Sequence, residues 1–487
     1  MPNAQSYRSA DTDRIDPMVW KIAAVVMLGP LMSMLDSTVV NVSLSTLSHD
    51  LHTTLTTIQW VTSGYLLSLA LMLPLSGWLV DRLGVRRVFL GCLVAFTVTS
   101  LLCGLANSAG SLILSRVLQG MAGGLLAPLS QMMLARVAGR HVARVMAISM
   151  MPVMIGPILG PALAGVILQH AGWRWIFLIN LPIGVLATIL CWRVLPADSN
   201  QRHPRALDLT GFLLLSPGLA MLLHSLDRIG GEASQRLSGG IEMLAALMLL
   251  LGFARHSMRR GEKALIDLAL FRNRTFLAAA LTQFLANCMM FGGQMLLPLF
   301  LLIVAGRAPA NAGVLLAATG FGSLCIFPWI GRLTEHFGPR AVAAVGGVVS
   351  LCGALPFALF DVSTLATPLL CCTLFTRGLG MGCLNIPAIS AAYSTTPKNL
   401  IPVATTGLNI VQRLGGPVAT TVLALYLHYG LTRLPAHTSS AAFIDTFRAL
   451  CLIHVLGIVA ALRLPSKAAH RASGSNAEAI ALLDEVA

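Results

Sequence analysis

Apolar segments separated by short polar connections recur along nearly the whole chain. A helix needs about 20 predominantly apolar residues to cross a bilayer, and the pattern provides fourteen such segments. The sequence therefore predicts an all-α membrane protein with fourteen transmembrane helices. These helices are expected at residues 19–44, 58–80, 88–105, 112–136, 144–168, 175–194, 209–226, 238–253, 276–304, 312–331, 341–360, 365–393, 402–429 and 443–462.

The composition agrees with a membrane protein and excludes a soluble globular chain. Hydrophobic residues make up 56% of the sequence and charged residues 11%, and the mean hydropathy is +0.78. A soluble domain carries roughly 25% charged residues. This chain therefore lacks the charge that would be needed to cover a surface of its size in water.

The net charge of +14 would suit a nucleic-acid-binding protein, but the positions of the charges argue against that function. Lys and Arg residues concentrate in alternate connections between the apolar segments, which is the distribution that orients membrane proteins. This distribution predicts a cytoplasmic N-terminus, and an even number of spans then places the C-terminus on the same side. We expect a multi-pass protein of the bacterial cytoplasmic (inner) membrane that binds no nucleic acid.

The sequence carries no motif for a cofactor, a metal ion or hydrolytic catalysis. All ten cysteines fall in apolar segments and form no C-x-x-C pair, so we expect them to be small core residues. There is no phosphate-binding loop of the form G-x-x-x-x-G-K-[ST], and the two histidines inside predicted spans, His224 and His454, are isolated. The chain is therefore predicted not to be an enzyme, to use no cofactor and to draw its energy from an ion gradient.

Two motifs occur twice, at similar separations. The pattern G-x-L-x-acid-x-x-G occupies residues 77–84 and again 331–338, and Arg116 with its following glycines is echoed by Arg377. Repeated halves are a feature of secondary transporters. The expected divisions are a cytoplasmic segment 1–18, a six-helix half 19–194, a linker with two inserted helices 195–275, a second six-helix half 276–462 and a cytoplasmic tail 463–487.

Five segments, in order along the chain, carry a family resemblance. They are residues 35–42, 77–87, 116–124, 156–161 and 173–184. Together they resemble the signatures of the major facilitator superfamily, and specifically of its fourteen-helix drug:proton antiporters from bacteria. The resemblance implies two pseudo-symmetric six-helix halves around a central cavity, two helices inserted between the halves (6+2+6), and export by alternating access.

Asp36 is the leading candidate for proton coupling. We find no other acid well inside an apolar segment, and intramembrane charges are costly enough to suggest a function. Desolvation favours the neutral form of a carboxyl group, so an acid at this depth is suited to exchanging protons. The resemblance also implicates Arg116 in proton transfer. The alternative for Asp36 is a fixed structural acid paired with an arginine, and the alternative for Arg116 is a structural hydrogen-bonding role.

The motif after the second span is expected to act as a conformational latch. In the resembled family it holds the two halves together in one state, and an acid such as Asp81 could do so against a helix N-terminus or a basic partner. The sequence departs from the family at Val85, where arginine is usual, and the second copy is weaker because Glu335 replaces the aspartate. The predicted latch residues are Gly77, Asp81, Arg82, Gly84 and Arg86.

The fifth span carries the pattern that the resemblance associates with antiport. Gly156 and Gly160 are spaced for close helix packing, and Pro157 and Pro161 each remove a backbone donor and bend a helix. We expect these four residues to form a hinge or seal, and simple close packing is the alternative.

Amide side chains mark a predicted substrate cavity. At 3.6 residues per turn, Gln283, Asn287 and Gln294 lie on one narrow stripe of the ninth span, together with Met290. Interhelical hydrogen bonding is the alternative for such stripes. The predicted cavity residues are Asn41, Gln119, Gln283, Asn287, Met290, Gln294, Asn409, Gln412 and Arg413.

These observations predict a proton-coupled exporter of small amphipathic molecules, such as drugs or dyes. The alternative on the same fold is an exporter of one metabolite, such as an organic acid, a siderophore or an amino acid. A membrane enzyme would show clustered catalytic residues, and a sensor would carry a folded domain outside the membrane. The expected partners are small-molecule substrates, protons and the lipid bilayer, and the protein is expected to function as a monomer.

Overall fold

The computed structural model describes residues 15–198, 206–231, 233–360, 366–397, 400–433 and 439–466. Most of the predicted segments 1–18 and 463–487 therefore lie outside the described residues. In the described part the chain is helical and contains no strand. The α-helices are α1 (Pro17–Val26), α2 (Leu28–Asp50), α3 (Leu55–Ile58), α4 (Trp60–Met72), α5 (Leu75–Leu83), α6 (Val85–Gly104), α7 (Ala109–Ala138), α8 (Val142–His170), α9 (Arg174–Leu178), α10 (Asn180–Val194), α11 (Leu209–Gly230), α12 (Arg236–Arg260), α13 (Arg274–Leu299), α14 (Pro309–Phe337), α15 (Pro339–Leu359), α16 (Thr367–Ser394), α17 (Ile401–Arg433) and α18 (Ser439–Leu462).

The predicted all-α membrane fold is confirmed. Thirteen helical segments in the described part of the chain are long and apolar enough to cross a bilayer. The remaining predicted span, 144–168, lies within the 29-residue helix α8. Three spans consist of consecutive helices with short irregularities between them: α1 with α2, α3 with α4 and α5, and α9 with α10.

The break between α1 and α2 has a local cause. Pro30 has no backbone N–H, so it cannot donate to the carbonyl oxygen of Val26 one turn earlier. The hydroxyl of Ser130 on α7 donates to that oxygen instead, at 3.0 Å. The first span is therefore bent six residues before Asp36, and a neighbouring helix compensates for the lost hydrogen bond.

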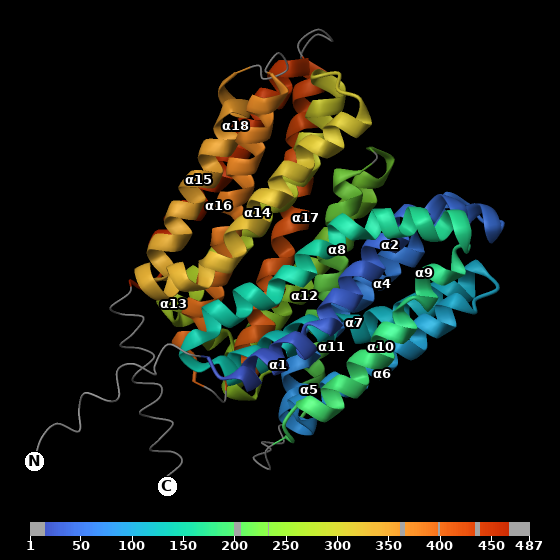
Figure 1. Ribbon diagram of the computed structural model, residues 1–487, viewed down its shortest axis with the longest axis vertical. Helices are drawn as coiled ribbons and strands as arrows, with labels where there is room; N and C mark the ends of the chain where they lie inside the picture. The colour runs from blue at the N-terminus through green and yellow to red at the C-terminus, as the bar shows by residue number, and fades with distance from the viewer. Residues whose placement is uncertain are drawn as a thin grey trace, which may run out of the picture.

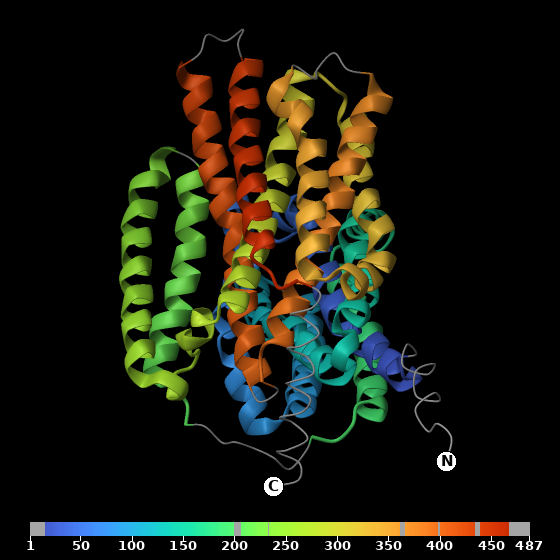
Figure 2. The same ribbon diagram turned by 90° about the vertical axis from the view of Figure 1, so that its left-hand side faces the viewer.

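The helices form two groups, α1–α10 and α13–α18, that meet at one end and diverge toward the other (Figure 1). We call the meeting point the closed end; α1 begins and α18 ends there. The α11–α12 pair packs against α17 and stands outside the main bundle (Figure 2). It also contacts the first group, because Trp60 on α4 lies 6.0 Å from the ring of His224 on α11.

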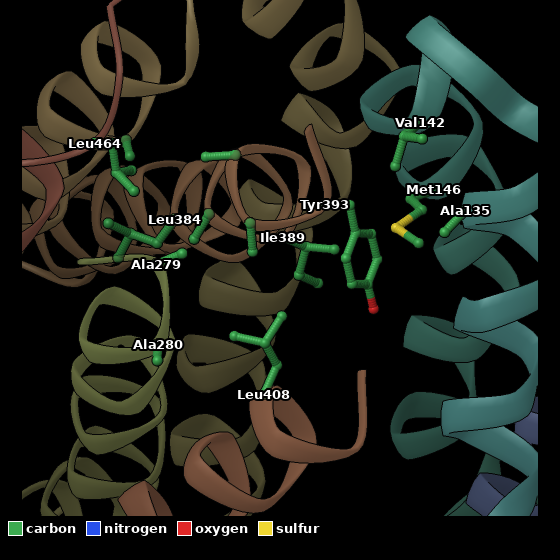
Figure 3. Packing of buried hydrophobic residues seen from close by; sticks show 14 of the residues in the cluster. Ala135, Val142, Met146, Ala279, Ala280, Leu384, Ile389, Tyr393, Leu408 and Leu464 are labelled. Carbon is green, nitrogen blue, oxygen red and sulfur yellow. The ribbon is translucent and has the colours of Figure 1, made fainter. Parts of the chain in front are cut away.

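An apolar cluster joins the two groups at the closed end. Val142 and Met146 on α8 face Ile389 and Tyr393 on α16, and all four residues are buried (Figure 3). Burying a side chain of this size stabilises a contact by about 1.5–3 kcal/mol in water. In this conformation the closed end is therefore sealed by packed side chains.

Polar side chains also connect the two groups of helices. The hydroxyl groups of Ser76 and Thr406 are 2.7 Å apart, and Asn409 donates to Gln131 Oε1 at 2.8 Å. A third contact joins His141 Nδ1 to Glu335 Oε1 at 3.0 Å. All three pairs connect the first group with the second, so the closed end is held by side chains from both.

The connection into the inserted pair is anchored by Asp208, which caps α11. Its carboxylate accepts hydrogen bonds from the backbone of Gly211 and Leu265 and from the side chains of His256 and Arg260. Burial opposes ionisation of Asp208, but these hydrogen bonds outweigh it and hold the pKa of the carboxyl below its usual value. Asp208 thus connects the start of α11 to the end of α12.

Candidate functional site

The predicted proton-coupling residues meet in one cluster inside the first group of helices. Asp36 on α2 is 1% exposed, and its Oδ2 lies 2.5 Å from Nη1 of Arg116 on α7. Its Oδ1 accepts hydrogen bonds from Asn180 at 2.8 Å and from Gln119 at 3.2 Å. The carboxylate thus meets three hydrogen-bond donors from two other helices, one of them a guanidinium.

Arg116 is held as firmly as its partner. Its Nε donates to the carbonyl oxygen of Val61 at 3.2 Å, and its Nη1 also donates to Gln119 Oε1 at 2.7 Å. The guanidinium lies over the ring of Tyr65, 4.2 Å from the centroid, where a cation is attracted by the π electrons. Arg116 Nη2 is buried and has no hydrogen-bond partner in the described part of the chain.

The cluster also contains residues that the sequence did not single out. Asn180 begins α10 and donates to both Asp36 and Ser100 on α6, at 2.8 and 3.1 Å. Tyr65 donates to or accepts from Ser33, one turn before Asp36. Asn180 lies within the resemblance segment 173–184, so a signal was present, but nothing in the sequence shows that this amide reaches α2.

The predicted latch residues lie at the closed end, where the second span meets α17. Gly77 packs against Pro402 and Thr406, since a Cβ at this position would lie 3.4 Å from the Pro402 carbonyl oxygen. Asp81 and Trp78 line a small pocket together with Val403. The guanidinium of Arg82 lies 5.6 Å from the ring centroid of Trp78.

Asp198 joins this motif, and the sequence did not predict it. Gly84 has a φ of +90°, a backbone conformation that other residues rarely adopt, and a side chain there would overlap with Asp198. The Asp198 carboxylate accepts from the backbone N–H groups of Arg86 at 2.9 Å and Arg87 at 3.2 Å. The acid thus satisfies free donors at the N-terminus of α6.

The predicted hinge in α8 packs directly on the helix that carries Asp36. A Cβ at Gly156 would lie 3.1 Å from Met34, and one at Gly160 would overlap with the side chain of Thr38. Thr38 Oγ1 also lies 3.5 Å from the Gly156 carbonyl oxygen. Pro157 and Pro161 are part of α8, but their side chains lie outside what the structure describes.

The structure does not gather the predicted cavity residues on a single surface. Gln119 belongs to the Asp36 cluster, and Asn409 binds Gln131 across the two groups. Gln283 is buried, and neither its Nε2 nor its Oε1 has a hydrogen-bond partner among the described residues. Of the others, Asn287 is buried, Met290, Gln412 and Arg413 are half-buried, and Asn41 and Gln294 are exposed.

One interpretation of the sequence was wrong. Asp36 is not alone as an acid within the spans, because Glu242 lies inside α12, and His224 is not isolated. His224 Nδ1 lies 2.7 Å from Glu242 Oε1, and Arg228 lies 3.7 Å from the same carboxylate. The two partners come from the two inserted helices, which explains why no single helical face shows the pair.

In the described residues we find no group of three or more His, Cys, Asp or Glu side chains that could hold a metal ion. The arrangement that stands out is instead a buried ion pair among helices that cross the membrane. Together with two groups of helices that carry repeated motifs, it defines a secondary transporter.

Comparison with known proteins gives the family. The sequence profile of the Major Facilitator Superfamily matches residues 26–420, so the chain belongs to that superfamily. It is 37% identical over 423 residues to the Multidrug resistance protein B homolog of Mycobacterium tuberculosis (strain ATCC 25618 / H37Rv), covering 86% of this chain and 78% of the relative. It is 31% identical over 472 residues to the Putative multidrug resistance protein MdtD of Enterobacter sp. (strain 638), covering 93% and 96% of the two chains.

Solved structures support the same fold. The proton:xylose symporter XylE aligns with a TM-score of 0.57 at 14% identity, covering 89% of this chain and 94% of the symporter. The human organic anion transporter MFSD10 aligns with a TM-score of 0.61 at 15% identity, covering 91% and 99% of the two chains. At these identities the likeness concerns the fold alone.

Proposed function

We propose that this protein is a proton-coupled exporter of small amphipathic molecules that works by alternating access. The observation that carries the proposal is the buried Asp36–Arg116 pair. The names of the two relatives, both multidrug resistance proteins, support export of several compounds. We further propose that the protein functions as a monomer in the bacterial cytoplasmic membrane, with both termini and the closed end on the cytoplasmic side.

Proton uptake by Asp36 would change the balance of charges in the cluster. In the ionised state Asp36 compensates Arg116 and accepts two amide hydrogen bonds. A protonated carboxyl no longer compensates the guanidinium, so the conformation that buries both groups becomes less favourable. The Thr38–Gly160 contact lies only two residues from Asp36, and a shift of α2 would therefore reach α8.

Energy for export would come from the membrane potential and the pH gradient. Moving one charge through 100 mV supplies about 2.3 kcal/mol. One proton per cycle at this potential sustains a concentration ratio of roughly 50, since 1.4 kcal/mol corresponds to a factor of 10.

The alternative is export of one specific metabolite on the same fold. Arg413 favours an organic acid, because it is half-buried and no acidic partner for it is found in the described part of the chain. A panel of neutral, cationic and anionic compounds separates a broad exporter from a specific one.

The test is dye efflux from the protein in everted membrane vesicles, driven by an imposed pH gradient. Asp36→Asn keeps the size of the side chain but replaces one accepting oxygen by an amide group and removes the proton exchange. We expect gradient-driven transport in the parent and its loss in Asp36→Asn. The control is Asp445→Asn, which removes an exposed acid paired only with Arg448; equal transport by parent and Asp36→Asn would overturn the assignment.

A further inference from the structure

The second group of helices contains a buried arginine in the position that corresponds to Arg116. Arg377 on α16 is 3% exposed. Its Nη2 donates to the Met289 carbonyl oxygen on α13 at 2.7 Å, and its buried Nε has no partner among the described residues. No carboxylate is paired with Arg377 among the described residues; the titratable side chains near it, Cys451 and His454 on α18, are a thiol and an imidazole.

The position that corresponds to Asp36 is a glycine. Gly293 follows the start of α13 by the same number of residues as Asp36 follows the start of α1. A Cβ at Gly293 would overlap with the guanidinium of Arg377, so the two positions are in contact, as Asp36 and Arg116 are. The second group thus retains the cation of the pair and presents bare backbone where the first group presents a carboxylate.

A buried guanidinium without an anion is unfavourable in a medium of low dielectric constant. One backbone carbonyl does not neutralise it. His454 cannot do so either, since its Nδ1 faces the Leu450 carbonyl oxygen and its Nε2, which is buried, has no partner in the described part of the chain. The surroundings of Arg377 therefore favour an anion that the chain itself does not supply.

The distribution of charge between the helices points the same way. Among the described acids, Asp36, Glu242 and Asp445 lie inside membrane-spanning helices, and all three already have basic partners. Arg377 and the half-buried Arg413 have none. A cationic molecule would find no available carboxylate beside Arg377, whereas an anionic one would find its guanidinium group.

We propose that Arg377 binds the anionic group of the transported molecule, and that the preferred substrates are amphipathic monoanions such as carboxylates. The proposal rests on the proposed export function and names its substrate class. Gly293 leaves no side chain between Arg377 and this turn of α13, and the next residue, Gln294, is exposed. An arginine binds a carboxylate through two parallel hydrogen bonds, which gives both affinity and orientation.

The test measures binding of three matched probes to the purified full-length protein in nanodiscs. The probes are 1-pyrenebutyrate, its methyl ester and 1-pyrenebutylamine, which share the apolar part and differ in charge. Binding is followed by energy transfer from tryptophan to pyrene. We expect the parent to bind the carboxylate about tenfold more tightly than either of the other probes, as a charged hydrogen-bonded pair allows.

Gly293→Ala is the sharpest variant because it moves the guanidinium without changing any charge. Its methyl group meets only the flexible end of Arg377, whereas in the control, Gly292→Ala, it meets the aliphatic side chains of Leu423 and Leu450. Gly293→Ala and Arg377→Gln should remove the preference for the carboxylate and leave ester binding unchanged. Gly292→Ala and Arg448→Gln should keep the preference. If Arg377→Gln does not fold, the comparison is made with Gly293→Ala and Arg377→Lys.

Equal or tighter binding of the amine by the parent would overturn the proposal. An unchanged carboxylate preference in Gly293→Ala and Arg377→Gln would overturn it as well. The same holds if these variants bind all three probes more weakly by the same factor. The proposed function fails separately. If a pH gradient drives efflux of the amine but not of the carboxylate, export stands and the anion site falls; if the preference is found but no gradient drives transport, the anion site stands and proton-coupled export falls.

Discussion

The two groups of helices bury arginines at corresponding positions but treat them differently. Arg116 contacts an acid, an amide and an aromatic ring, all from its own group. Arg377 meets one carbonyl oxygen and a glycine. The motifs around the two residues resemble each other, so the difference lies in the facing helix, where α2 has Asp36 and α13 has Gly293.

This difference suggests that the two groups of helices have different roles in transport. A complete ion pair responds to the gain or loss of a proton, because protonation of the acid leaves the cation uncompensated. An incomplete pair responds to the arrival of an anion. In an exporter, proton uptake and substrate binding must occur at different stages of the transport cycle. Because the two sites lie in separate groups of helices, one movement at the interface between the groups can couple them.

The largest expected effect comes from removing the cation of the Asp36–Arg116 pair in the first group of helices. Arg116→Met leaves Asp36 buried without its cation, which should cost about 3–5 kcal/mol of unfolding free energy. The double variant Asp36→Leu with Arg116→Met removes both charges and should recover most of this loss while remaining inactive in gradient-driven transport. Thermal unfolding of the purified variants in detergent measures the effect. A double variant no more stable than Arg116→Met would show that the pair does not act as a unit.

The converse experiment adds the missing acid opposite Arg377 in the second group of helices. Gly293→Asp places a carboxylate where Arg377 can pair with it, as Asp36 pairs with Arg116. We expect carboxylate binding to fall about tenfold, since a resident anion competes for the guanidinium, while Asp36-dependent proton coupling is retained. Binding of 1-pyrenebutyrate measures the change. Because any side chain at residue 293 displaces the guanidinium, charge pairing is measured separately, as the difference in thermal unfolding between Gly293→Asp and the uncharged Gly293→Asn. The aspartate variant should be the more stable of the two, and equal stability would indicate steric displacement instead of charge compensation.

Close packing links the first half's ion pair to the interface. Gly160→Ala would force its methyl group against Thr38, two residues from Asp36, and overpacking of this kind typically costs 1–3 kcal/mol. Gly165→Ala lies on the same helix with no atom within 4 Å and serves as the matched control. We expect slower efflux in Gly160→Ala alone. If both variants transport like the parent, the contact between α2 and α8 does not limit the cycle.

The helices could be predicted, and Asp36 could be recognised as a candidate functional residue, because each follows from a single segment of sequence. A span is recognised from about 20 apolar residues, and an acid inside one is conspicuous by its cost. The fold prediction is confirmed by the thirteen long apolar helices and by α8. The roles of Asp36, of the latch and of the hinge stay predictions, because they concern transport.

Partners from separate helices could not be predicted. Asn180 reaches Asp36 across 144 positions of sequence, and Glu242 meets His224 only because α11 and α12 pack side by side. The predicted cavity stripe on α13 was also ambiguous, since Gln283 is buried and Gln294 is exposed although both follow one helical face. Which side of a stripe meets protein and which meets open space depends on how the two halves lie relative to each other.

The smallest expected effect concerns the contact that crosses between the halves. Asn409 and Gln131 form one side-chain hydrogen bond at 2.8 Å, and a bond of this kind contributes about 0.5–1.5 kcal/mol. Asn409→Ala and Gln131→Ala should each shift the population away from the conformation with a sealed closed end by about two- to tenfold. Cross-linking of cysteines introduced at Ser76 and Thr406, whose hydroxyl groups are 2.7 Å apart, reports that population. The double variant should shift it no further than either single variant, because both remove the same bond; additive shifts would mean that each amide acts through other partners, and the halves would then be coupled elsewhere along the interface.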